Sequence, residues 1–402
     1  MTVQELQTKL FEMDVPHYYY NICGSGENEE QRICLINEAG KWLVYYRTAT
    51  AWRSPNMRTR QRRAPTATAG LWSKTMKLLK IVAAVISAVM LCGCATAPKN
   101  QPLEVSTAPI AEKGCVTPPF WVVEDESTGA QIFLLGSMHA GKADTQYPEY
   151  VLEALRNSSW VAPEMDTVAF AGDFILQQKC VKYLVLSGTT AKELIGSAYD
   201  ETVDYFRKSG IWQDAMDSMA PFYWASAASS LVVDKAGLDT SYGTENVLLT
   251  LAHQEGIKIR EIEGGEAQYR MMGSIPMSVQ LETLAQCVGD DNINAQVRDT
   301  EELFEAWSRF DDDYFSKLTV FSADEVTNPF DWQEYYDMMY TDRQQKMADF
   351  ITDSLSKGEL GFVFVGTMHY YAEPSVITLL EQEGYTVTAI RGISAGDGLI
   401  AA

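Results

Sequence analysis

Two stretches of the sequence, IFLLGSMH at residues 132–139 and FVFVGTMH at residues 362–369, share one pattern, and the expected sheet is built around it. Each stretch begins with four apolar residues, continues with a glycine and ends with a histidine three positions later. A short apolar run of this length is typical of a strand that is buried on both faces of a sheet. We therefore expect two buried strands, each with a histidine just beyond its carboxyl end.

The residues that follow the two stretches also correspond. A helix is expected over about 148–157 in the first case and 374–383 in the second, and a proline opens each, as is common at a first helical position. A further strand is expected after each helix, at 160–164 and at 385–390. The order of strand, helix and strand predicts two βαβ-like repeats in one sheet.

A third unit lies between the two repeats. Apolar residues at helical spacing over 246–255 end at Gly256, and a strand is expected over 257–263. The rest of the middle region has helical spacing in five segments, at 202–208, 222–236, 279–287, 301–309 and 335–357. The expected fold class is α/β (α+β), with a largely parallel, mixed central sheet and a large helical insertion.

The repeats place two of the four histidines, His139 and His369, at equivalent positions. Open α/β sheets bind ligands beyond the carboxyl ends of their strands, so both imidazoles should face one crevice. Gly136 and Gly366 are expected to let the backbone turn where a Cβ would clash. Two histidines and one carboxylate can hold a divalent metal and leave positions for water and substrate. The alternative is that both histidines are structural and cap loops.

Two glutamates, Glu164 and Glu263, each end an expected strand and should reach the same edge of the sheet. One could ligate a metal, and the other could be the general base that activates water. Arg343 precedes a helical run and could stabilise the negative charge of a tetrahedral intermediate. The alternatives are capping or salt-bridge roles for the glutamates and a plain surface position for Arg343. His253 lies within an expected helix and is expected to be structural.

These residues resemble the TraB/GumN/Tiki family over about residues 116–400. The family's L-L-G-T-x-H motif, with a glutamate about 25 residues later, is matched by LLGSMH and Glu164, and its closing V-G-x-x-H and G-Y-x-V by FVGTMH and GYTV. Its strand ending L-E-T corresponds to residues 262–264, and its R-N-x-x-M helix to residues 343–347. This chain departs from the family pattern at Ser137, Gly264 and Gln344, which affects how firmly Glu263 and Arg343 are held.

The resemblance implies a metal-dependent hydrolase, because Tiki proteins are proteases that need a divalent metal and use both Gly-x-x-His motifs. By this resemblance a divalent metal (Mn, Co or Zn) is expected, with a peptide or small molecule as substrate. The expected ligands are His139, His369 and Glu164, and the expected catalytic residues are Glu164, Glu263 and Arg343. The alternatives are a non-catalytic envelope protein that binds or regulates, and a metal-independent esterase that uses histidine and glutamate.

The charge of the chain argues against nucleic acid as a partner. The net charge is −22; residues 1–80 carry 12 Lys/Arg against 7 Asp/Glu, whereas the remaining residues carry 20 against 47. A protein that binds a phosphate backbone needs an excess of positive charge on its binding surface. The acidic main body is compatible with cations, although most acidic surface is simply solvated.

Residues 76–94 have the features of a lipoprotein signal peptide. Two lysines precede an apolar core at 81–91, which is too short to span a bilayer. The end, Leu-Cys-Gly-Cys, resembles a bacterial lipoprotein box, which implies lipidation of Cys94. We expect a product that starts at Met76, a tether over 95–115 and a main domain over 116–402. The expected location is the bacterial cell envelope, with a lipid anchor in the outer membrane that faces the periplasm.

The residues ahead of this signal form two segments of different character. Residues 1–54 include ICLINEAGKWLVYY, which predicts two strands around a turn, and they resemble part of a small bacterial immunity-type domain. Residues 55–75 form a basic linker without hydrophobic periodicity. No function is assigned to either segment.

Two cysteines of the helical insertion, Cys180 and Cys287, are candidates for a disulfide. Both would face an oxidising compartment if the chain is exported. The loop between them is long, so a bridge would contribute about 4–5 kcal/mol in the chain-entropy model.

Overall fold

The computed structural model describes residues 20–22, 33–38, 41–46 and 114–391. The chain divides into two compact units, Met1–Ala69 and Gly70–Ala402. The first unit contains a small sheet in the order β1 (Tyr20–Ile22), β2 (Ile33–Glu38) and β3 (Lys41–Tyr46). The pair β2–β3 is antiparallel, as the sequence predicted for two strands around a turn.

The second unit is built on a five-stranded sheet. Its order is β6 (Trp160–Pro163), β7 (Leu360–Gly366), β5 (Ala130–Ser137), β4 (Phe120–Asp125) and β8 (Thr386–Ala389). The pairs β5–β7 and β6–β7 are parallel, whereas β4 is antiparallel to both of its neighbours. The sheet is thus mixed, with two parallel and two antiparallel pairings, which confirms the expected α/β (α+β) class.

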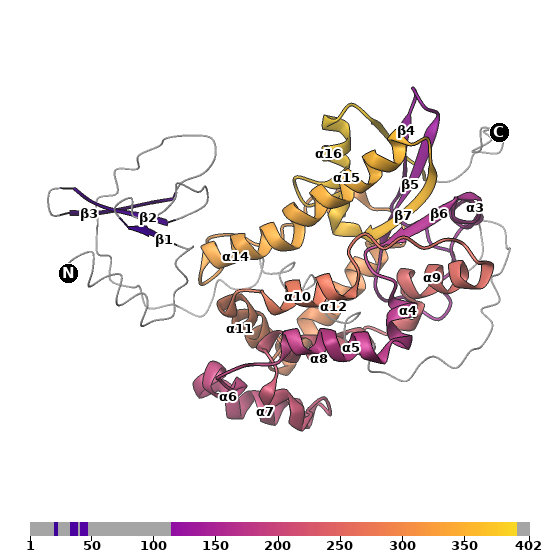
Figure 1. Cartoon of the computed structure of the whole chain (residues 1–402). Helices are drawn as coiled ribbons and strands as arrows, with labels where there is room; N and C mark the ends of the chain where they lie inside the picture. The colour runs from indigo at the N-terminus through magenta and orange to yellow at the C-terminus, as the bar shows by residue number, and fades with distance from the viewer. Residues whose placement is uncertain (1–19, 23–32, 39–40, 47–113, 392–402) are drawn as a thin grey trace. The chain divides into compact units, whose positions relative to one another are not determined.

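Alternate residues of the strands pack into two separate hydrophobic cores. One core contains Phe133, Leu135, Phe362 and Phe364, and the other contains Ile132, Leu134, Val363 and Val365. Helices α3 (Glu149–Asn157) and α9 (Thr244–Glu255) cover the first face, and α15 (Asp342–Ser356) and α16 (Val376–Gln382) cover the second (Figure 1). Because both faces are covered, the central strands are apolar throughout rather than alternating.

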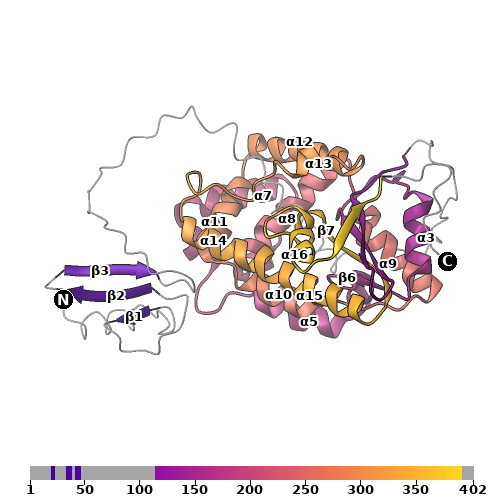
Figure 2. The ribbon, with the colours of Figure 1, turned by 90° about the horizontal axis from the view of Figure 1, so that it is seen from above.

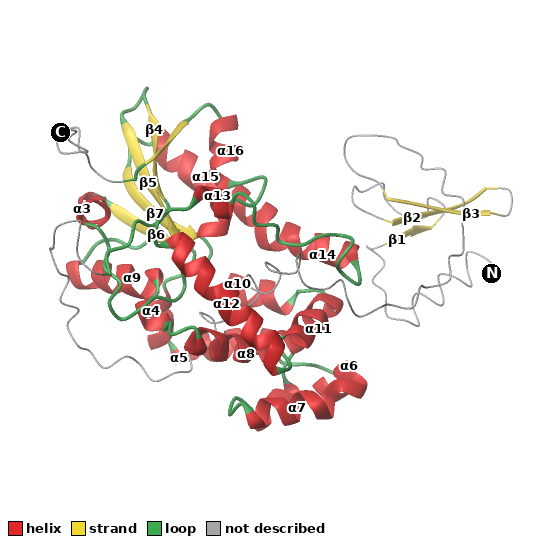
Figure 3. Cartoon of the chain, turned by 180° about the vertical axis from the view of Figure 1, so that it is seen from behind, coloured by secondary structure: helices red, strands yellow, loops and turns green. Residues whose placement is uncertain are grey.

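The helical insertion lies between β6 and β7 in the chain and forms a largely helical region beside the sheet (Figure 3). Part of it packs around its own core, which contains Phe206, Met216 and Trp224. Its helices are α4 (Thr167–Gly172), α5 (Phe174–Val181), α6 (Ala191–Ile195), α7 (Tyr199–Lys208), α8 (Pro221–Lys235), α9, α10 (Gly265–Gly273), α11 (Met277–Gln286), α12 (Asp290–Trp307), α13 (Asp312–Phe315), α14 (Pro329–Tyr336) and α15.

Three local expectations need correction. Residues 257–263 run parallel to β6 through backbone hydrogen bonds, but only one bridge, Val161 with Ile259, has ladder geometry, so this segment is not a regular strand. Pro148 is the residue before α3, and α16 begins after its cap Ser375, so neither proline occupies the first helical position. The single helix expected over 335–357 is interrupted by a π-helical turn, η7 (Asp337–Thr341).

The described residues contain no helix long and apolar enough to cross a membrane. The expected signal peptide at 76–94, with Cys94, and the linker at 55–75 lie outside the described residues.

Candidate functional site

The two Gly-x-x-His turns lie side by side because β5 and β7 are neighbours in the sheet. Their register pairs Ser137 with Gly366, so both turns leave the sheet at the same edge. Glu164 directly follows β6, which pairs with the other side of β7. His139, His369 and Glu164 therefore come from three adjacent parallel strands, as the sequence pattern predicted.

The two motif glycines serve different purposes, and neither adopts a positive φ. A Cβ at Gly136 would lie 2.9 Å from Thr367 Oγ1 and 3.2 Å from the Cβ of Pro119, so this glycine permits close packing between strand and turn. A Cβ at Gly366 would meet only ordinary contacts, at 3.5 Å from Glu164 Oε1, 3.7 Å from His139 Nε2 and 3.8 Å from His369 Cδ2. The expected clash is therefore found at Gly136 only, and the space beside Gly366 is the point that the three site residues surround.

Glu164 is held at this point by three hydrogen-bond donors and lies close to His369. Its Oε1 accepts a hydrogen bond of 2.8 Å from the Gly366 N–H, and its Oε2 accepts bonds from Arg343 at 2.5 Å and Gln268 at 3.0 Å. His369 Nε2 lies 3.6 Å from Oε1, beyond hydrogen-bond range but close enough for electrostatic interaction. Burial would raise the pKa of Glu164, but the nearby Arg343 guanidinium, helped by the adjacent imidazoles and the Gly366 N–H, lowers it to about 2. Glu164 is consequently a carboxylate at neutral pH.

Glu263 and Arg343 form a buried ion pair behind Glu164. The guanidinium donates from Nε to Glu263 Oε1 at 2.7 Å and from Nη2 to Glu263 Oε2 at 2.9 Å, and Gln268 also donates to Glu263 Oε2. Arg343 Nη1 donates to the carbonyl of Met339 at 3.3 Å. Both residues thus come to the site as predicted, but Arg343 is buried and paired rather than a surface residue, and Glu263 contacts no histidine in any interaction resolved here.

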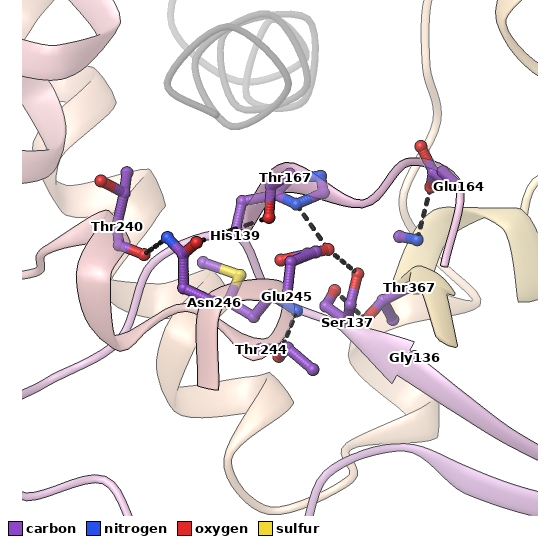
Figure 4. Close-up of polar contacts among 12 residues, drawn as sticks. Gly136, Ser137, His139, Glu164, Thr167, Thr240, Thr244, Glu245, Asn246 and Thr367 are labelled. Carbon is purple, nitrogen blue, oxygen red and sulfur yellow. Dashed lines mark hydrogen bonds and ion pairs between the residues drawn. The ribbon is translucent and has the colours of Figure 1, made fainter. Parts of the chain in front are cut away.

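His139 is oriented by a residue that the sequence pattern did not indicate, Glu245. Its Nδ1 lies 2.8 Å from Glu245 Oε1, close enough for an ion pair although not aligned as a hydrogen bond. Ser137 donates to the same oxygen at 2.5 Å, and Figure 4 shows both side chains meeting at Glu245. Burial alone would lower the pKa of His139, but the carboxylates of Glu245 and Glu164 outweigh that effect and raise it above 6.5.

The position of Glu245 is set by the first residues of α9. Thr244 N–H donates to the carbonyl of Met138 at 2.8 Å, and Met138 N–H donates to Thr244 Oγ1 at 3.0 Å. Gly243 packs so closely that a Cβ there would lie 2.2 Å from the carbonyl oxygen of His139. The segment Gly-Thr-Glu at 243–245 therefore fixes the start of α9 against the first motif, through contacts between residues about 100 positions apart that local sequence spacing does not reveal.

His369 is oriented by an amide instead of a carboxylate. Its Nδ1 lies 3.4 Å from Gln344 Oε1, and the amide nitrogen of Gln344 donates to the carbonyls of Ala372 and Pro374. These two bonds fix the amide with its oxygen toward the imidazole. Burial, reinforced by the charge of Arg343, lowers the pKa of His369 to about 3, so this imidazole is neutral.

Three other candidate residues lie outside this group. His253 Nε2 is 2.9 Å from Asp166 Oδ2, and Asp166 also caps α4, which gives His253 a structural environment. Cys180 and Cys287 are not joined to each other, because each packs into a different hydrophobic core. The predicted disulfide is therefore wrong for this structure.

The donor atoms suit a divalent cation, although the described residues contain no group of three or more His, Cys, Asp or Glu side chains already arranged to hold one. Each imidazole has its Nδ1 beside a polar anchor, which is the usual arrangement of metal-ligating histidines and leaves Nε2 for the ligand. Glu164 Oε1 would have to be shared between the cation and the Gly366 N–H. If Glu164 Oε1 is shared in this way, the residues His139, His369 and Glu164 have the chemistry needed to hold a divalent cation.

Comparison with known proteins gives one positive result. The model of the TraB/PrgY/gumN family matches residues 119–389, more than half of the chain, and this range contains every residue of the site described above. No match was found among curated proteins or among solved structures.

Proposed function

The chain belongs to the TraB/PrgY/gumN family, and we propose that the sheet edge around Gly366 is the active site of a metal-dependent hydrolase. The observation that carries the proposal is the matched anchoring of the two imidazoles. Both Nδ1 atoms lie beside polar anchors, while His139 Nε2 and Glu164 Oε1 lie around one point beside Gly366 and His369 Nε2 is 3.6 Å from the same carboxylate oxygen. A peptide bond is the first substrate class to test, in line with the resemblance to metal-dependent proteases.

The residues that would hold a divalent cation (Mn, Co or Zn) are His139, His369 and Glu164. When bound, such a cation polarises a carbonyl and lowers the pKa of water. Neutral His369 can bind without first losing a proton, because its pKa is already about 3. Arg343 pairs with both Glu164 and Glu263 and fixes them in place, so two carboxylates share one guanidinium and the site keeps negative charge that attracts a cation.

One observation favours a second candidate, a metal-independent hydrolase. His139 and Glu245 have the arrangement of a general base and the carboxylate that orients it. In that case His139 Nε2 takes the proton of the attacking water, and Glu245 stabilises the imidazolium that forms. A protein that binds a peptide without turnover is the remaining alternative, and it requires the same contacts without chemistry.

Metal analysis combined with turnover separates these candidates. The full-length protein, purified without chelator, should contain about one equivalent of a divalent metal, and a fluorogenic peptide library should show cleavage that EDTA abolishes and Mn²⁺, Co²⁺ or Zn²⁺ restores. Glu164→Gln should lose nearly all turnover, whereas His253→Ala should keep it. Cleavage that resists EDTA would favour the His139–Glu245 mechanism, and binding without cleavage would refute both hydrolases.

We further propose that the protein is lipid-anchored in the cell envelope, on the outer membrane and facing the periplasm. The support is the sequence at 76–94, with Cys94 at its end. Intact-mass analysis of the membrane fraction should find a mature species that starts at an acylated Cys94. A species that retains Met1 and carries no lipid would contradict this proposal.

A further inference from the structure

The helix that carries Arg343 departs from regular geometry just before that residue. Helices α14 and α15 follow one another nearly in line (Figure 2) and are joined by the π-helical turn η7. Such turns insert a residue into the helical register and are frequent at functional sites. Tyr340 lies in this turn, and its ring centroid is 5.6 Å from that of His369. The irregular turn thus places a tyrosine against one of the two site histidines.

The hydroxyl of Tyr340 is buried and has no hydrogen-bond partner among the described residues. Tyr340 as a whole is only 2% exposed, and its hydroxyl oxygen is fully buried. Leaving a buried polar group unsatisfied costs about 1–3 kcal/mol, so its retention requires an explanation. A phenol hydroxyl can donate as well as accept a hydrogen bond, so this group can serve as a donor beside His369.

Arg343 is poorly available for the role of hydrogen-bond donor to substrate. It makes four hydrogen bonds, to Glu263, Glu164 and the carbonyl of Met339. A guanidinium has five N–H groups in all. Stabilising the oxyanion of the tetrahedral intermediate, the role expected for Arg343, therefore suits better a donor that makes no hydrogen bond within the protein.

Two other buried tyrosines in the described part of the chain, Tyr150 and Tyr370, also have hydroxyls without partners. The ring of Tyr150, a residue of α3, packs against Phe120 in one core of the sheet, and the ring of Tyr370 packs against Trp121 in the opposite core. Among these three residues, the ring contacts resolved here join only Tyr340 to a site histidine.

We propose that the Tyr340 hydroxyl is a catalytic hydrogen-bond donor, which binds the carbonyl oxygen of the substrate and the oxyanion that forms on it. The assignment rests on the proposed hydrolase function. A row of aromatic rings continues from Tyr340 to Tyr336 and Phe321, with centroids 5.2 Å and 6.2 Å apart. Tyr336 and Phe321 are half-buried, so the row leads from His369 toward the surface. The substrate class that fits is a carbonyl compound with an aromatic or apolar group beside the reacting carbon.

The test compares full-length wild-type protein with Tyr340→Phe and with Tyr150→Phe as the matched control. On the best peptide of the library, Tyr340→Phe should lower kcat by about 10²–10³-fold, the usual cost of losing one oxyanion donor, with little change in KM. Its Tm should be equal or higher, because the removed hydroxyl has no partner, and Tyr150→Phe should retain wild-type kcat. A kcat within twofold of wild type, or a clear loss of Tm, would overturn the proposal.

A binding measurement keeps the inference separate from the proposed function. Calorimetry should show that benzylphosphonate, a stable tetrahedral oxyanion with an aromatic group, binds wild-type protein at least tenfold more tightly than Tyr340→Phe. If the wild-type protein cleaves no peptide, the hydrolase proposal fails and this comparison alone decides the role of Tyr340. Equal affinities for the two proteins, or no binding to either, would then reject it.

Discussion

The turn after β5 and the turn after β7 have nearly the same sequence, yet their histidines lie in opposite electrostatic environments. His139 faces the carboxylate of Glu245, and its pKa is raised above 6.5. His369 faces the amide of Gln344, and burial with the nearby Arg343 lowers its pKa to about 3. A repeated motif therefore fixes where each imidazole lies, whereas its protonation is decided by partners from distant parts of the chain. The two imidazoles therefore have pKa values that are shifted in opposite directions.

The largest expected effect is the loss of activity when either imidazole is removed. His139→Ala and His369→Ala should each lower kcat/KM by at least about 10³-fold, and the double variant should be no worse, because groups that act as a unit are not additive. His253→Ala, which removes a histidine bound to Asp166, is the control and should stay near wild type. Additive losses in the double variant would show that the two histidines work independently.

Alanine substitutions at the two motif glycines should affect different properties, turnover in one case and stability in the other. Gly366→Ala fits sterically but places a methyl group among His139, Glu164 and His369, so turnover should fall by about 10²-fold with little loss of stability. Gly136→Ala forces a methyl group against Thr367 and should instead lower the free energy of unfolding by about 1–3 kcal/mol. Urea denaturation and turnover of both variants check this; the reverse pattern would mean that the roles of the glycines are misassigned.

Exchanging the two anchors should make the histidines more alike. Glu245→Gln gives His139 an amide anchor, and the affinity of the protein for Mn²⁺ should fall by about 10–100-fold, as when a carboxylate that orients a ligating histidine is lost. Gln344→Glu places a new carboxylate beside buried His369 and should raise the pKa of that imidazole. Gln345→Glu, on the exposed side of the same helix, is its control. Unchanged Mn²⁺ affinity in Glu245→Gln would show that Glu245 does not orient a metal-ligating histidine.

The smallest expected effect is on stability against pH. The pKa of His369 is about 3 in the folded chain, below the ordinary value of 6.5. Between these two values the imidazole is protonated in the unfolded chain but not in the folded chain. The contribution of His369 to the free energy of unfolding is therefore fully present above pH 6.5 and decreases as the pH falls, by about 2 kcal/mol at pH 5. His139, with a raised pKa, should act in the opposite sense: its contribution is present below pH 6.5 and lost as the pH rises through its folded pKa.

Unfolding of His369→Gln and His139→Gln at pH 5 and pH 7 measures this difference. Relative to wild type, the first substitution should remove part of the acid sensitivity, and the second should remove part of the alkaline sensitivity. His253→Gln serves as the control, since its side chain is 41% exposed. Parallel stability curves for the two variants would show that the imidazoles are not in different states.

The sheet edge could be predicted from the sequence because a buried parallel strand appears there as a short, continuous run of apolar residues. The apolar runs before Gly136 and Gly366, and the strand before Glu164, identified three adjacent strands and the three residues at their ends. Strand β4 was not expected; its outer residues Glu124 and Asp125 are polar, and its pairing with β5 and β8 is long-range. Local periodicity carries no information about such pairings.

The anchors of the histidines could not be predicted for the same reason. Glu245 lies at a buried position of α9, where helical spacing alone would place an apolar side chain. Arg343 was correctly brought to the site, but its pairing with Glu164 and Glu263 depends on α15 packing over the sheet. The helix expected to begin at 301 begins at Asp290, because Gly289, at φ 97°, ends the preceding segment and the polar first half shows little apolar period.

The most direct test of a shared metal site is anomalous diffraction from crystals of the protein grown with Zn²⁺. A shared site should give a single strong peak about 2.0–2.2 Å from Nε2 of both His139 and His369, with Glu164 Oε1 within reach of the same ion. Strong density elsewhere, or a peak that touches only one of the two imidazoles, would contradict the claim that the two Gly-x-x-His turns form one metal centre.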